Sequence, residues 1–130
     1  MDIKSVDFNT AELKAGPDII FTAKSVAAAA TSAAFYLGDV LAKLEVVVKV
    51  STAFVVGTSV KVSIIGAATN DLSASPVELM ATTKTAAVAE GVELLRYVIP
   101  KDVGPYLGVA IVSTGVNTGA IDAYVHMIAN

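Results

Sequence analysis

Turn-forming residues divide the last third of the chain into three short apolar runs. The runs cover residues 93–99, 106–113 and 120–128, with Pro, Gly, Asn and Asp between them. Runs of this length that are rich in Val, Ile, Leu and Tyr are typical of β-strands joined by short turns. We therefore expect an antiparallel β-meander here. No catalytic motif lies in or beside it, which favours a scaffolding or binding surface over an active site.

The clearest single strand is predicted at residues 43–51, where side chains alternate with a period of two. The face expected to be buried carries Leu44, Val46, Val48 and Val50. The opposite face carries Glu45, Val47, Lys49 and Ser51. Residues 58–65 repeat the pattern, and because Gly57 supplies a turn between the two segments, we expect them to pair as a hairpin.

The remaining segments complete an all-β pattern. Residues 27–30 are four alanines, which favour a short helix locally, but the β-branched and aromatic flanks favour extended segments at 19–26 and 31–37. A polar loop at 66–76 precedes a short strand at 77–83. About seven or eight strands spaced near ten residues apart predict a two-sheet antiparallel β-sandwich. Strand count does not separate an immunoglobulin-like sandwich from a jelly roll, although the immunoglobulin hallmarks Cys and Trp are absent.

The domain division follows from the same pattern. Residues 1–17 mix charges with scattered apolar side chains at no sustained period, so we interpret them as an irregular N-terminal arm. Residues 18–130 then form one β-sandwich domain. Such an arm gains order only when it docks, because it buries too little surface by itself. We expect it to make contacts outside its own sandwich.

The composition favours other protein subunits as partners and argues against nucleic acid. The chain is 55% hydrophobic and only 16% charged, against about 25% charged in ordinary domains. This favours burial of outer surface against copies of itself, as a dimer or trimer, or against a partner. Val46–Val48 and Val55-Val56, apolar on both strand faces, are the expected contact segments. The net charge of −3 and the scattered basic residues argue against direct binding to nucleic acid.

The sequence also argues against a transmembrane helix and against a signal peptide. The longest uncharged stretch, residues 103–121, contains Pro105, four glycines and Asn117, which would break a membrane helix. The first residues lack the apolar core of a signal peptide. We expect a protein that is soluble, or soluble once assembled.

The side chains that could carry chemistry do not form a set. His126 is the only histidine, and Asp122 lies four residues before it on the same predicted strand, about 13 Å away and too far for a dyad. Ser113 in the preceding strand could approach His126, although any pair of strands would offer some serine. We interpret His126 as a surface or interface residue and expect no catalytic site. Ile121, Ala123, Val125 and Met127 are predicted to face the core.

Metal, nucleotide and sugar sites have little support. Asn70 and Asp71 offer two oxygen ligands in their loop, fewer than calcium needs, and we interpret them as turn residues. Glu90 and Glu93 bracket a turn, and no glycine-rich phosphate motif follows a strand. We expect no metal and no cofactor. Three tyrosines of the last third could form a sugar platform, but they are more typical of strand packing: Tyr97, Tyr106 and Tyr124.

The second half of the chain has an order of elements that resembles a known family. It runs KVSIIGAATND, SPVELMAT, Glu90-Gly91, LLRYVIP, PYLGVAIV and TGVNTGAIDAYVHMIA. This order is similar to the jelly-roll capsid cement (decoration) proteins of tailed bacteriophages, of the Bordetella-phage type. Tyr106 and Leu107 match a Tyr-Leu pair of that family, and Pro100 matches its strand-ending proline. The chain departs at Pro105 and Gly108, where the family often has basic residues, so attachment through arginines there is not expected.

The resemblance covers residues 60–130 and implies a jelly-roll fold and a role in the virion. The chain would be made in the host cytoplasm, form homo-oligomers on the outer surface of an icosahedral head, and stabilise contacts between major capsid proteins. The expected function is therefore structural and not enzymatic. The alternative is a non-catalytic ligand-binding β-sandwich, such as a carbohydrate-binding module.

Overall fold

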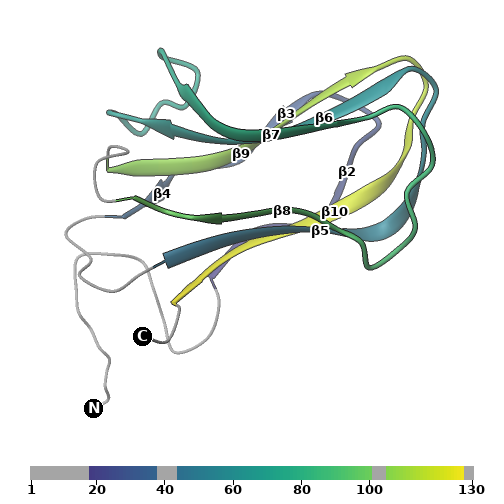
Figure 1. Cartoon of the computed structure of the whole chain (residues 1–130). Helices are drawn as coiled ribbons and strands as arrows, with labels where there is room; N and C mark the ends of the chain where they lie inside the picture. The colour runs from purple at the N-terminus through teal and green to yellow at the C-terminus, as the bar shows by residue number, and fades with distance from the viewer. Residues whose placement is uncertain (1–17, 38–43, 101–104, 128–130) are drawn as a thin grey trace.

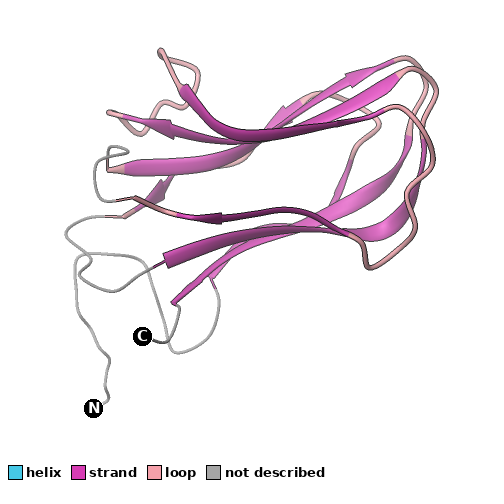
Figure 2. Ribbon diagram, in the orientation of Figure 1, coloured by secondary structure: helices cyan, strands magenta, loops and turns pink. Residues whose placement is uncertain are grey.

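The protein is an antiparallel β-sandwich, described here from a computed structural model for residues 18–37, 44–100 and 105–127 (Figure 2). The described residues form strands and connections but no helix. Among them there is therefore no helix long and apolar enough to cross a membrane. In chain order the strands are β2 (Asp18–Ser25), β3 (Ala30–Thr31), β4 (Phe35–Tyr36), β5 (Leu44–Val55), β6 (Ser59–Ala67), β7 (Val77–Lys84), β8 (Glu93–Val98), β9 (Tyr106–Thr114) and β10 (Thr118–Met127).

The strands form two layers (Figure 1). One sheet has the order β2-β10-β5-β8. The other has the order β3-β9-β6-β7, with β4 also paired to β9. All of these pairs are antiparallel. The predicted two-sheet antiparallel β-sandwich is therefore confirmed.

Early and late strands pair with one another in a nested order. The outermost strands β2 and β10 pair, then β3 and β4 with β9, then β5 with β8, and finally the adjacent strands β6 and β7. The order is that of a long hairpin folded over on itself. Successive strands therefore often lie in opposite sheets, and the chain crosses from one layer to the other at most of its turns.

A single apolar core fills the space between the sheets. Its members include Val46, Val48, Ile64, Val109 and Ile121, each 0% exposed. For Val46, Val48 and Ile121 this is the placement that the alternation of side chains predicts. Small β-branched side chains fit this layer because they pack well on a pleated surface. The alanine- and valine-rich composition is thus partly a property of the core.

Two predicted pairings are wrong. Residues 43–51 and 58–65 do form strands, but β5 pairs with β10 and β8, whereas β6 pairs with β9 and β7 in the other sheet. They do not form a hairpin. The last three strands are likewise not a meander, because β9 lies in the sheet opposite β8 and β10. A glycine turn serves a crossing between sheets as well as a hairpin, and alternation of side chains does not distinguish the two.

Several strand boundaries also differ from the prediction. The segment 31–37 is divided into the two-residue strands β3 and β4, while β5 extends to Val55. The predicted strand residues Lys43 and Ile128 lie outside the described residues, as does the predicted arm at residues 1–17. The extended segment at 19–26 and the strand at 77–83 are confirmed by β2 and β7.

Two expectations about exposure are wrong. Ile121, Ala123 and Val125 are buried as expected, but Met127 is 43% exposed, at the end of β10 and not in the core. The run Val46–Val48 is fully buried within the single chain, so it has no area left for a contact between subunits. Val55 does remain exposed, at 65%.

Candidate functional site

The outer face of the β2-β10-β5-β8 sheet carries the most concentrated polar contacts of the described chain. Antiparallel register places Glu45 of β5 opposite His126 of β10 on one side and Val98 of β8 on the other. One step along the sheet, Val47 lies between Tyr124 and Arg96. Because side chains two residues apart share a face, these residues all project outward.

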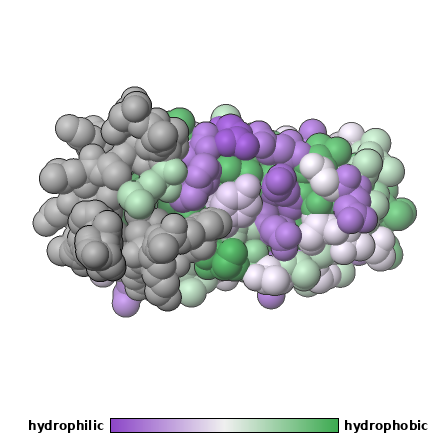
Figure 3. Space-filling view, turned by 90° about the horizontal axis from the view of Figure 1, so that it is seen from below, coloured by the Kyte–Doolittle hydropathy of each residue, from purple (hydrophilic) through white to green (hydrophobic). Residues whose placement is uncertain are grey.

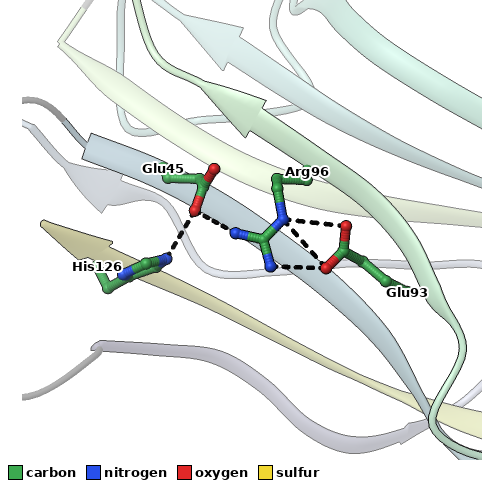
Figure 4. A network of polar contacts seen from close by, with 4 residues as sticks. All are labelled: Glu45, Glu93, Arg96 and His126. Atoms are coloured by element: carbon green, nitrogen blue, oxygen red, sulfur yellow. Dashed lines mark hydrogen bonds and ion pairs between the residues drawn. The ribbon is translucent and has the colours of Figure 1, made fainter. Parts of the chain in front are cut away.

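Four side chains form a connected polar network, shown in Figure 4 and called the Glu45 network below. The guanidinium of Arg96 donates to Glu93 through Nε, at 3.1 Å to Oε1 and 3.0 Å to Oε2, and through Nη2, at 2.7 Å to Oε1. Arg96 Nη1 also donates to Glu45 Oε1. The same oxygen lies 2.9 Å from His126 Nε2. The network therefore connects β8, β5 and β10 through side chains.

The partners in this network explain how the carboxylate of Glu45 is stabilised at a largely buried position. Glu45 is only 8% exposed, and a carboxylate removed from water needs charged or hydrogen-bonding partners. Arg96 and His126 supply them at one oxygen. Since a carboxylate only accepts hydrogen bonds, Nε2 of His126 carries the hydrogen in this contact.

Pairing shifts two pKa values in this network. The hydrogen bonds from Arg96 lower the pKa of the exposed Glu93 carboxyl. The hydrogen bonds to Glu93, followed by the nearby negative charge of Glu45, raise the pKa of Arg96. Both shifts favour the ionised forms. Glu93 and Arg96 are thus an ion pair at neutral pH. The clearest role of the whole network is to hold three neighbouring strands in register.

The structure separates the residues considered as a catalytic group. His126 pairs with Glu45 and not with Asp122, whose Oδ1 accepts a 2.7 Å hydrogen bond from the Ala23 amide on β2. Ser113 lies on β9 in the other sheet, where its Oγ accepts from Asn117 at 2.7 Å. The expectation that Ser113 might approach His126 is therefore wrong. The sequence offered no sign of the Glu45–His126 contact, which depends on strand register.

The residues considered as metal ligands have local roles. Asp71 Oδ1 accepts hydrogen bonds from the Ser73 amide at 3.0 Å and from the Ser73 hydroxyl at 2.6 Å, and these bonds lower the pKa of Asp71. This is the predicted turn chemistry. Asn70 and Glu90 are exposed. Among residues 18–37, 44–100 and 105–127, no three His, Cys, Asp or Glu side chains gather as a metal site would require.

The three tyrosines do not form one platform. Tyr97 packs against the core between the sheets, Tyr124 lies on the outer face beside His126, and Tyr106 lies in the opposite sheet. Tyr106 instead meets Tyr36, with ring centroids 5.2 Å apart and the planes tilted by 47°. The interpretation of these tyrosines as packing residues fits Tyr97 and also Tyr106, which packs against the buried cluster that contains Leu72.

Asn117 is a structural residue that sequence reasoning treated only as a turn marker. It is 3% exposed, and its Oδ1 accepts from the Gly57 amide at 2.8 Å. Its Nδ2 group lies 3.1 Å from the carbonyls of both Ser59 and Thr114. Asn117 therefore joins the β5–β6 turn to the β9–β10 turn. A Cβ at Gly57 would lie 2.5 Å from the Val116 carbonyl oxygen, so this close approach requires glycine.

Comparisons with known proteins leave the family open. No protein-family model, no curated protein and no solved structure matches this chain. The likeness to capsid cement proteins therefore rests on the residues and strand order of the chain itself.

Proposed function

We propose that this chain is a non-catalytic structural protein that decorates the outside of an icosahedral phage head and strengthens contacts between major capsid proteins. The observation that carries the proposal is the nested strand pairing. We take the sheet orders β2-β10-β5-β8 and β3-β9-β6-β7 as support for the wrapped double hairpin of a jelly roll. This supports the topology that the sequence resemblance implies, over the part of the chain that includes β6 to β10.

The polar chemistry of the described residues agrees with a structural role. The Glu45 network ties strands together, Asp71 closes a turn, and Asn117 joins two turns. Each of these groups makes hydrogen bonds within the fold. A protein that acts through contact area needs a stable shape with reactive groups that are already satisfied, and these contacts supply one.

Self-association is part of the proposal. Several large apolar side chains remain exposed in the single chain, among them Ile19 at 61%, Val77 at 61%, Val98 at 50% and Val112 at 51%. They are spread over both outer faces and the strand edges. Together with the low charged fraction, they support burial against further copies, as a dimer or trimer.

The direct test is decoration of heads that lack the protein. Purified protein should co-sediment with such heads and should raise the temperature at which they release DNA. If saturating protein neither co-sediments with the heads nor changes that temperature, the capsid assignment is wrong. Deleting residues 1–16 should leave the far-ultraviolet circular dichroism unchanged but weaken attachment, and unchanged attachment would show that the segment is not an anchor.

The carbohydrate-binding alternative makes a different prediction. Tyr36 and Tyr106 are the aromatic pair to test, although their 47° tilt does not offer one flat surface for a sugar ring. A monomer by size-exclusion chromatography with light scattering, which loses glycan binding in Tyr106→Ala, would favour that function. A stable oligomer without glycan binding would favour decoration.

A further inference from the structure

β7 is a free edge of the β3-β9-β6-β7 sheet. Among the described residues it pairs on one side only, with β6, and the pairing is continuous from Lys84 to Met80. The register shifts once, between Met80 and Glu78. Val77 is 61% exposed and Met80 39%, so the edge is open to solvent. The backbone N–H and C=O groups that point away from β6 are therefore available to a further strand.

The other edges of the described sheets are less suited to such pairing. β2 shifts register twice against β10, and its Ala23 has a φ of 45°, in the left-handed region that interrupts an extended strand. β3 and β4 have two residues each. β8 has six residues, and Figure 3, a view onto the outer face of its sheet, shows hydrophilic side chains (purple) gathered over part of that face. β7, with eight residues, is the most extensive regular edge.

The charges of β7 favour a second copy of the same strand as its partner. Glu78 lies near the start of β7 and Lys84 at its end, and the residues between them are uncharged. Ala81 is midway, so antiparallel pairing about Ala81 brings each Glu78 to about the level of Lys84 from the other copy. Glu78 already lies 2.8 Å from Lys61 of its own chain, and Lys84 would join this pair. Opposite charges across strands stabilise their pairing, whereas a parallel arrangement would bring like charges together.

The number of backbone contacts fits a specific dimer. An antiparallel pair exchanges two hydrogen bonds at every second residue pair. Residues 78–84 from both copies would therefore form about six to eight hydrogen bonds, against about ten in a typical protein interface. A row of unpaired N–H and C=O groups is complementary to another extended strand, which is how sheets gain strands from a partner.

We propose that this chain forms a dimer in which β7 pairs antiparallel with β7 of a second copy, centred on Ala81. The β3-β9-β6-β7 sheet then continues across the two subunits, and the outer faces of both subunits remain free for other partners. This inference rests on the self-association within the proposed function and specifies the surface that carries it. It can be tested on the purified protein without any capsid.

Cysteine cross-linking tests the geometry of the pair. The chain has no cysteine, so Ala81→Cys introduces a single thiol in each subunit. Directly opposed residues of antiparallel strands have Cα atoms about 4.5–5.5 Å apart, within reach of a disulfide. We expect Ala81→Cys to form a disulfide-linked dimer in air-oxidised protein. Val112→Cys, exposed on β9 in the same sheet, is the matched control and should stay unlinked. Equal linking of both variants, or none in Ala81→Cys, would contradict the proposal.

A charge at the centre of the pair tests its strength. Ala81→Lys would place two ammonium groups opposite one another, and like charges at this position oppose strand pairing. We expect the dissociation constant of the dimer, measured by sedimentation velocity, to rise at least about tenfold, and by less than about twofold in Val112→Lys. Circular dichroism checks that both variants are folded. If Ala81→Lys does not fold, the cross-linking result decides, and equal dissociation constants in the two folded variants would overturn the assignment to β7.

The results separate this inference from the proposed function. A dimer joined through β7 that does not bind phage heads would support the inference and contradict the capsid role. Heads bound by a protein that stays monomeric, or that forms a trimer, would contradict the inference while the capsid role stands. A monomer whose β7 instead pairs with an extended segment of another protein would assign the edge to that partner.

Discussion

The two outer faces of the sandwich are stabilised in different ways. On the β2-β10-β5-β8 sheet, the fully buried Val47 lies beside Arg96 and Tyr124, and the Glu45 network crosses the strands. On the other sheet, Ile65 and Ala67 form a separate apolar cluster that is closed by Leu72, a residue of the loop after β6. One face carries a connected network of charge pairs, whereas the other carries a loop that packs on the sheet and the exposed pair Lys61–Glu78, at 2.8 Å.

The difference has consequences for stability. Charge pairs are weakened by acid and by salt, whereas an apolar contact is largely indifferent to both. Leu72 fits because Gly108 leaves room: a Cβ at position 108 would collide with the Leu72 side chain.

The largest loss of stability is expected when a charged residue replaces a core residue of β10. Val125 faces the core from β10 and is 0% exposed, next to the outward His126. Val125→Asp would place an unpaired charge in the core, and we expect a loss of more than about 4 kcal/mol, which unfolds the domain. Circular dichroism would show this. Thr118→Asp, at an exposed position of the same strand, is the control, and a native spectrum for both variants would contradict the placement of β10.

The loop contact should come next. Leu72 is 5% exposed, so Leu72→Ala should lower the free energy of unfolding by about 2 kcal/mol. Urea unfolding measures the change, and Thr69→Ala in the exposed part of the same loop is the matched control. The loss should be similar at low and high salt. If Leu72→Ala costs no more than Thr69→Ala, the loop does not stabilise this face.

The positions of Val125 and Leu72 differ in how far the sequence could predict them. Alternation predicted which side of β5 and of most of β10 faces the core, because a period of two is a local property. It could not predict which sheet β6 or β9 joins, because that depends on partners far away in the chain. Glu45 and Arg96 are 51 residues apart, so their contact follows from pairing and not from any local pattern. The burial of Leu72 was not predicted for the same reason, since its loop is polar in sequence and its contacts lie on the sheet.

A smaller effect is expected at the edge of the Glu45 network. The sequence alone suggested an exposed His126 whose removal would change stability by within about 0.5 kcal/mol. The contact with Glu45 raises the expected cost of His126→Ala to about 1 kcal/mol, since one partner of a largely buried carboxylate is lost. Val112→Ala on the other face is the control. A cost equal to that of the control would mean that the Glu45 contact contributes nothing measurable.

The smallest effect concerns acid stability. Because pairing with Arg96 lowers the pKa of Glu93, this carboxylate stabilises the fold above its unfolded-state pKa. That contribution is lost as the pH falls through the lower, folded-state pKa. Glu93→Gln should therefore flatten the fall in stability with acid while lowering stability slightly at neutral pH. Arg96→Gln should remove the same dependence of stability on pH. Melting temperatures measured across acid pH test this. If the melting temperature falls with pH equally steeply in the wild type and both variants, the pairing does not contribute to stability.

We propose that this chain acts through surfaces that it shares with other molecules, beginning with its own copies. Sedimentation velocity at micromolar concentration tests it most directly, without any knowledge of the capsid partner. We predict a dimer or trimer of the 13.3 kDa chain that persists on dilution through the micromolar range. A single boundary at the mass of the monomer throughout that range would contradict the claim.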